Sequence, residues 1–330
     1  MKVKQLLIGL SVVMFLFASM QIQAAPEQGI TYEYKNGIAT IETANVTISV
    51  NAMGTIPTFH YRLASGYSVN VMFKQIHEYQ DLNEDGVFQY NESLVGNPPL
   101  SLSSIQWDFS GFDVEEAGDL VTAAHFNFTS DTIIGALYND LEVTLAMHLY
   151  LEDQVIDGYE LIGGAEFKFD IYINGWPWQE VDSLLALRFD ITPEEGSQIK
   201  NQNNQVIDTT ESTTNNEQQL AAEENQIKQR LTIANDENGL FFGYANQSRI
   251  RNTYESQYRY GNVNASCSST GDGILQVFLS FEHADSIIYD PSLGTDDSGV
   301  AETASSWIAA VILPLLAVAI VRVSYYFKRR

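Results

Sequence analysis

Twelve consecutive residues, 81–92, carry oxygen atoms at the spacing that a single calcium ion requires. A calcium ion takes about six to eight oxygen ligands at about 2.3–2.6 Å, and a short loop supplies them only by winding round the ion. Gly86 stands at the sixth place, where it permits the sharp turn. The expected ligands are the side chains of Asp81, Asn83, Asp85, Gln89 and Glu92 and the backbone carbonyl of Val87. The sequence therefore predicts a metal site whose cofactor is Ca²⁺.

The stretch fits the pattern D-x-[DN]-x-[DN]-G-x5-E at every specified place. It resembles the EF-hand calcium loop and, less closely, the loop of dockerins. The resemblance implies that Glu92 binds the ion with both carboxylate oxygens and that Gln89 binds it directly or through a water molecule. It also implies that Phe88 fills the apolar eighth place of the loop.

The surroundings of this stretch differ from those of an EF-hand, which has a helix on each side of its loop. Pro98 and Pro99 follow too closely for an exit helix, and residues 69–79 alternate like a strand. We therefore expect a lone calcium loop in a β domain, which fixes a connection instead of triggering a conformational change. An acidic surface turn without an ion is the alternative. Asn91 begins a glycosylation sequon, so either that sequon is unused or the eleventh place faces outward.

Both ends of the chain indicate export and membrane attachment. Lys2 and Lys4 precede an apolar run that ends in small residues, which is typical of a secretory signal peptide over residues 1–24. A short membrane anchor is the alternative. Residues 307–327 are long and apolar enough for one transmembrane helix, and the basic residues 328–330 orient that end to the cytoplasm. A GPI signal is the alternative there, although the basic terminus argues against it.

The charge of the chain limits its partners. The two ends hold six of the 17 basic residues and none of the 42 acidic residues, so the part between them carries a net charge of −31. Such a surface repels nucleic acid and suits cations or basic partners. Solubility alone is an equally good explanation of the charge. Cys267 is the single cysteine, so the chain has no intrachain disulfide.

Apolar residues recur at every second position along much of the chain, which is the pattern of β-strands. The cleanest stripe runs over residues 143–151, and Asn36-Gly37 between two such runs is a strong hairpin signal. Further strands are expected at residues 167–173, 183–191, 239–246 and 273–281. The predicted fold class is all-β, an antiparallel β-sandwich ectodomain over residues 26–289 with an inset calcium loop, plus one C-terminal transmembrane helix.

Two segments lack this pattern. Residues 196–228 are rich in Gln, Asn, Thr and Glu, and we expect a polar, mobile excursion between strands. Within it and just beyond, residues 217–231 fit a helix and a coil equally well. Residues 290–306 are acidic and rich in small residues, and we expect a stalk between the last strand and the membrane.

Other residues give weaker chemical signals. Trp176 and Trp178 follow a strand, where exposed rings would stack on a sugar or insert into a membrane, and buried rings would cap the core. We favour the core. Tyrosines and arginines between residues 249 and 260 form one basic, aromatic patch, which we interpret as a half-buried strand pair that neutralises nearby carboxylates. Binding of an anionic group is the alternative. No catalytic motif is present, and the histidines show no zinc-ligand spacing.

These observations predict a single-pass type I protein of the cell membrane with its ectodomain outside. The preferred function is a calcium-stabilised binding or adhesion module for a surface protein or glycan ligand. A purely structural envelope protein is the third hypothesis, after the hydrolase described next. A membrane-tethered hydrolase of polysaccharide, with Trp176 and Trp178 as a sugar platform, is the alternative; whether the chain is an enzyme stays open, and we lean against it.

Overall fold

The computed structural model describes residues 29–51, 57–96, 98–130, 138–156, 158–201, 203–212, 218–219 and 228–295. The predicted signal peptide, transmembrane helix and cytoplasmic basic end lie outside these residues. Within them the chain is all-β and antiparallel, as the sequence predicts, and the 3₁₀ turn η1 (Leu102–Ser104) is the one helical element.

The strands form because apolar side chains alternate with polar ones. In β3 (Val46–Asn51) and β11 (Glu142–Tyr150) the apolar residues are buried on one face, and their neighbours in sequence point to the other face. Asn36 and Gly37 both adopt positive φ angles, of 52° and 79°, as the tight turn between β1 and β2 requires.

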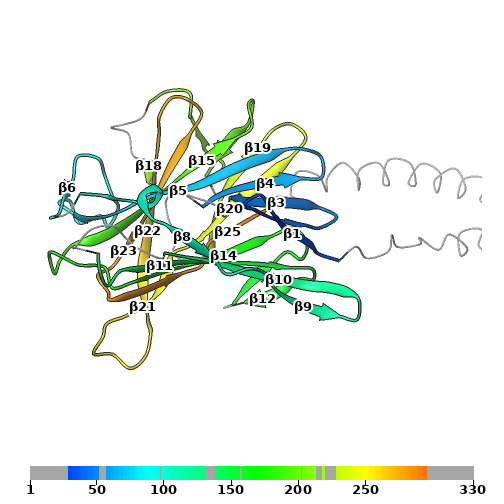
Figure 1. The fold of residues 1–330 in the computed structure, drawn as a ribbon. Helices are drawn as coiled ribbons and strands as arrows, with labels where there is room; N and C mark the ends of the chain where they lie inside the picture. Colours follow the sequence, from blue (N-terminus) through cyan, green and yellow to red (C-terminus); the bar gives the residue numbers. More distant parts are fainter. Residues whose placement is uncertain are drawn as a thin grey trace, which may run out of the picture.

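The first layer of the fold is one half of a continuous antiparallel sheet (Figure 1). Its neighbouring strands, in spatial order, are β1 (Thr31–Lys35), β2 (Ile38–Glu42), β3, β4 (Thr58–Leu63), β5 (Ser68–Gln80), β15 (Leu184–Pro193), β23 (Leu275–Phe281), β22 (Arg259–Ser269) and β18 (Gln218–Gln219). The short strands β6 (Ser93–Leu94) and β7 (Leu100–Ser101) pair with the second half of β5.

The second layer is centred on β14 (Phe167–Asn174). One side continues through β11 and β10 (Leu120–Ser130) to β8 (Trp107–Phe109) and β9 (Asp113–Ala117). The other side of β14 pairs with two strands, β24 (Ser286–Tyr289) and β25 (Ser292–Thr295). Strand β24 leads to β21 (Gln247–Arg251). Strand β25 leads, in spatial order, to β20 (Gly239–Ala245), β19 (Lys228–Ala234), β16 (Gln198–Lys200) and β17 (Val206–Ile207). Strand β22 joins the layers, and β12 (Gln154–Ile156) with β13 (Tyr159–Leu161) forms a separate hairpin.

Aromatic side chains fill the space between the two layers. Phe59 of β4 stacks on Phe169 of β14 with ring centroids 5.8 Å apart, and Phe189 of β15 meets Phe242 of β20 at 4.8 Å. All four side chains are buried in one contiguous apolar core. Burial of such rings is the dominant favourable term in folding, so this core holds the domain without disulfides.

The structure differs from the sequence predictions at two segment boundaries. The excursion expected over residues 196–228 contributes β16 and β17, whose Ile199 and Ile207 are buried in the core. Of the stretch 217–231, expected as helix or coil, residues 228–231 belong to β19 and residues 218–219 to β18, while residues 217 and 220–227 lie outside the described residues. Residues 292–295 of the stalk expected over residues 290–306 instead form β25, which pairs with β20 and β14 and buries Leu293, and residues 296–306 lie outside the described residues.

Candidate calcium site

The loop over residues 81–92 is the tip of a β-hairpin. It leaves β5 and enters β6, and these strands pair antiparallel through Gln80 opposite Ser93 and Tyr79 opposite Leu94. The amide of Val95 also donates to the carbonyl of Glu78 at 3.0 Å. The ends of the loop are therefore held together by strand pairing, where an EF-hand would have two helices.

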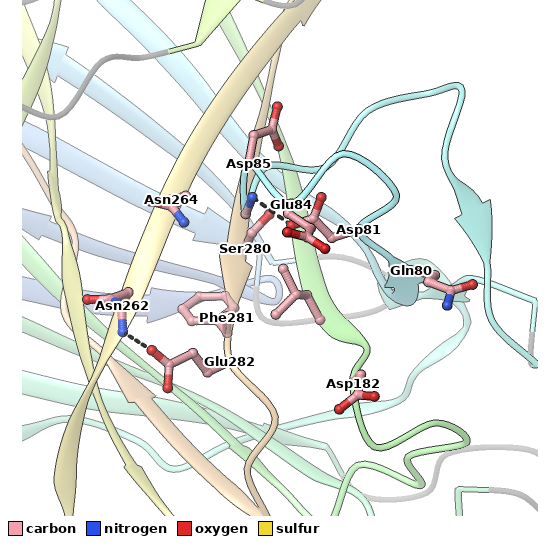
Figure 2. A pocket seen from close by; sticks show the side chains of 12 residues that line it. Gln80, Asp81, Glu84, Asp85, Asp182, Asn262, Asn264, Ser280, Phe281 and Glu282 are labelled. Atoms are coloured by element: carbon pink, nitrogen blue, oxygen red, sulfur yellow. Dashed lines mark hydrogen bonds between the residues drawn. The ribbon is translucent and has the colours of Figure 1, made fainter.

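Backbone amides turn the acidic side chains of the loop inward. The amide of Gly86 donates to Oδ2 of Asp81 at 2.7 Å, across the turn that the φ of +74° at Gly86 creates (Figure 2). The amide of Val87 donates to Oδ1 of Asp85 at 2.9 Å, and that of Asp85 to Oδ1 of Asn83 at 3.3 Å. These bonds orient three of the predicted ligand side chains within one turn of the chain.

Glu92 closes the loop from the other end. It is buried, and its two oxygens accept hydrogen bonds from the amides of Leu82 at 3.2 Å and Gln89 at 2.8 Å. Burial raises the pKa of Glu92 to about 7, the two amides act against that rise, and the charges of Asp81 and Asp85 raise it further. The loop thus brings three carboxylates close enough to repel one another, and a cation among them would relieve that repulsion.

The donor set fits a hard cation, although the amides require rotation. Oδ1 of Asp81 is buried without a hydrogen-bond partner. Oδ2 of Asp85 accepts from the side-chain amides of Asn83 and Gln89, both at 2.9 Å. Rotating each amide by half a turn presents its oxygen in place of its nitrogen, as calcium ligation requires, and at Asn83 this rotation exchanges the bond from the Asp85 amide for metal ligation. Over the described residues, no three His, Cys, Asp or Glu side chains already stand together as a metal cluster.

The second half of the loop is anchored on the outer face of the first layer. Phe88 is buried against His77 of β5 and Phe278 of β23, with ring centroids 4.4 and 4.9 Å away. Its amide donates to Ser280 Oγ at 3.1 Å, and its carbonyl accepts from Ser266 Oγ at 3.0 Å. The apolar eighth place is therefore filled as the EF-hand resemblance implies, but by contact with a sheet.

A pocket of about 610 Å³ lies between this loop and strands β22 and β23 (Figure 2). Its acidic lining residues are Asp81, Glu84, Asp85, Asp182 and Glu282, and no basic residue lines it. Asn264 closes the space next to Gly86, because a Cβ atom at Gly86 would stand 2.3 Å from the Asn264 amide nitrogen. The loop thus forms one wall of an electronegative pocket.

Trp176 and Trp178, in the loop after β14, pack into and against the apolar core. Trp176 is buried, and the indole N–H of Trp178 donates to the carbonyl of Ala284 at 2.9 Å while its ring stacks on His283. The predicted core role fits these contacts, and the exposed sugar platform of the hydrolase alternative is not formed. Sequence reasoning missed Glu78, whose buried carboxylate accepts from the amides of Gln179 and Glu180 and from Trp176.

The basic, aromatic patch is a strand pair with acidic neighbours. Strands β21 and β22 form a hairpin, in which Arg259 lies 3.2 Å from Glu282 and Arg249 lies 3.6 Å from Asp290. The guanidinium of Arg251 lies over the ring of Tyr258. These contacts agree with the interpretation that the patch neutralises nearby carboxylates.

No protein-family model matches the sequence, and no curated protein is significantly similar to it. Among solved structures, that of HI1317 is similar over 80% of this chain and 98% of its own, with 8% identity and a TM-score of 0.36. That similarity is too remote to indicate a function or a set of site residues. No helix in the described part of the chain is long and apolar enough to cross a membrane.

Proposed function

We propose that this chain is a single-pass type I surface protein whose ectodomain is a β-sandwich stabilised by one calcium ion. Asp81, Asn83, Asp85, Gln89 and Glu92 would hold the ion with their side chains, and Val87 with its carbonyl. The carrying observation is that backbone amides of the loop hold the carboxylates of Asp81, Asp85 and Glu92, and that burial of Glu92, with the charges of Asp81 and Asp85, raises its pKa to about 7. A bound cation converts that repulsion into attraction.

The ion would act as a structural clasp. The loop joins β5 to β6 and covers His77 and Phe278 through Phe88, so ordering the loop orders one face of the first layer. An ion that binds only the folded state stabilises it by mass action. No bistable helix pair flanks the loop in the described residues, which favours a static role over signalling.

The protein would use this face as a binding module in adhesion or in the cell envelope. The acidic pocket beside the loop favours a ligand that presents basic groups. Because the loop forms one wall of the pocket, calcium would set the shape of the binding face.

The experiment immobilises the full-length protein and measures binding of fluorescent oligolysine, with oligoglutamate and a neutral polysaccharide as comparison probes. We expect oligolysine to bind in calcium and to be released by EGTA. Glu84→Gln and Asp182→Asn, which change the pocket wall, should weaken that binding while calcium still binds. Equal binding of all probes, or oligolysine binding indifferent to both substitutions, would contradict the proposed binding role.

A further inference from the structure

Two histidines that look unrelated in the sequence face each other on the outer side of the second layer. His125 of β10 and His148 of β11 stand opposite one another in the strand register, and their Nδ1 atoms are 2.9 Å apart. Their neighbours Phe126 and Met147 point into the core, so the two imidazoles lie on the opposite face. Each histidine side chain is 20% exposed, which leaves the pair accessible from solvent.

A carboxylate stands behind each imidazole. Nε2 of His125 lies 3.7 Å from Glu115, and Nε2 of His148 lies 3.6 Å from Asp170. A carboxylate in this place favours the tautomer with the proton on Nε2, which leaves the Nδ1 lone pair free. Two such lone pairs at 2.9 Å repel each other unless a cation lies between them. If one ring instead donated an Nδ1–H bond to the other Nδ1, that ring would be neutral only with Nε2 unprotonated, and the Nε2 lone pair would then face a carboxylate. With Nε2 also protonated, the donating ring would carry a positive charge.

The separation of the two nitrogens matches that of neighbouring ligands on one metal ion. With metal–nitrogen bonds of about 2.0–2.1 Å, two nitrogens 2.9 Å apart subtend an angle of roughly 90° at the ion. Right-angled nitrogen ligands are typical of the tetragonal sites of Cu²⁺ and Ni²⁺. The carboxylate behind each imidazole is the outer-shell partner that metal-binding histidines usually have.

We propose that His125 and His148 form a two-histidine binding site for a divalent transition-metal ion of the Cu²⁺ and Ni²⁺ class. This site is separate from the calcium loop, which offers only oxygen ligands. No third His, Cys, Asp or Glu ligand stands with the pair in the described residues, so water or an external ligand completes the coordination.

The charges around the pair favour a divalent cation. Glu115 and Asp113 approach from β9, Asp170 from β14, and Asp290 from the end of β24. Two cations oppose them: Lys168 contacts Asp170 and Asp290, and Arg249 lies 3.6 Å from Asp290. The surroundings therefore carry two more negative charges than positive ones. Desolvation, with the charge of Lys168, lowers the pKa of His148 to about 4, so its ring is neutral at neutral pH, as a metal ligand must be.

The test titrates the full-length protein with Cu²⁺ by calorimetry and records the electron paramagnetic resonance spectrum of the complex. We expect one Cu²⁺ per chain with nitrogen hyperfine splitting. His125→Asn and His148→Asn should each remove that splitting and weaken binding at least tenfold. His60→Asn, a matched change on β4 where Nδ1 bonds Asn70, should have no effect.

Glu115→Gln keeps both rings and alters an exposed side chain, so it tests the site even if a histidine variant fails to fold. We expect it to weaken Cu²⁺ binding about 10–100-fold. The proposal is overturned if the wild-type chain binds no Cu²⁺, or if wild-type and His125→Asn chains bind it alike. It is also overturned if Glu115→Gln leaves the affinity unchanged.

Discussion

Calcium should raise the melting temperature of this protein, and the size of the rise follows from the structure of the loop. Among the proposed ligands Asn83 and Asp85 are exposed and two amides must rotate, so we expect weak binding with a Kd of about 10⁻⁴–10⁻³ M. At about 10 mM calcium, mass action then contributes about 1.4–2.7 kcal/mol. For a domain of this size that corresponds to a rise of roughly 3–11 °C.

The matched variant for this measurement is Asp81→Asn. Its side-chain oxygen still accepts the hydrogen bond from Gly86, so the turn is preserved while one ligand charge is lost. Asp236→Asn, in the exposed turn between β19 and β20, is the control for a loss of charge elsewhere. Differential scanning calorimetry in calcium and in EGTA should show the rise in the wild-type and control chains and little of it in Asp81→Asn.

Two results would refute this reasoning. A wild-type melting temperature that is the same in calcium and EGTA would mean that the loop binds no ion at these concentrations. A rise of equal size in Asp81→Asn would mean that calcium binds elsewhere on the acidic surface. Magnesium at the same concentration controls for general screening of charge, because the ligand-rich loop favours the larger ion.

Three further predictions concern the loop and its support. The pKa of Glu92 is about 7 in the folded protein and 4.5 ordinarily. Without calcium, the folded state therefore binds more protons than the unfolded state at pH values between these two pKa values. The free energy of unfolding should therefore fall as pH rises from about 5 to 7, as measured by urea unfolding, and this dependence should vanish in Glu92→Gln. A free energy that rises with pH over this range would contradict the prediction. Glu78→Ala leaves several buried donors unpaired and should lower the free energy of unfolding by about 3 kcal/mol or more in the same assay. Glu78→Gln should lower it less, and an equal loss in both variants would count against the hydrogen-bond role of Glu78. Phe88→Ala should cost about 3–5 kcal/mol and weaken calcium binding, whereas Leu82→Ala, 60% exposed, should change stability by under about 0.5 kcal/mol.

The strands could be predicted because one face of each is buried. Where that condition holds over many residues, as in β11, the alternation of apolar and polar side chains is plain in the sequence. The hairpin at Asn36-Gly37 was predictable for a different reason, since few residues other than asparagine and glycine accept two successive positive φ angles.

The misplaced boundaries have a common physical cause. Strands β16 and β17 are only three and two residues long, and each buries a single isoleucine, Ile199 or Ile207. One apolar residue in a polar stretch produces no periodicity. The burial of Leu293 in β25 was missed in the same way, because its neighbours are small and polar.

The candidate sites also differ in how far the sequence alone could predict them. The proposed calcium ligands lie within twelve residues, so the prediction of this site needs only their spacing in the sequence. The supports of the loop, Ser266 and Ser280, come from distant strands and carry no local signal. His125 and His148 meet only through the register of β10 and β11, which the sequence does not specify.

Direct measurement of bound calcium tests the central claim best. Equilibrium dialysis of the full-length protein against radioactive calcium should show one ion per chain with Kd of about 10⁻⁴–10⁻³ M. Asp81→Asn should abolish that ion, and Asp236→Asn should retain it. A wild-type chain that retains no calcium at these concentrations, or an Asp81→Asn chain that retains it fully, would contradict the account of residues 81–92 as a calcium clasp.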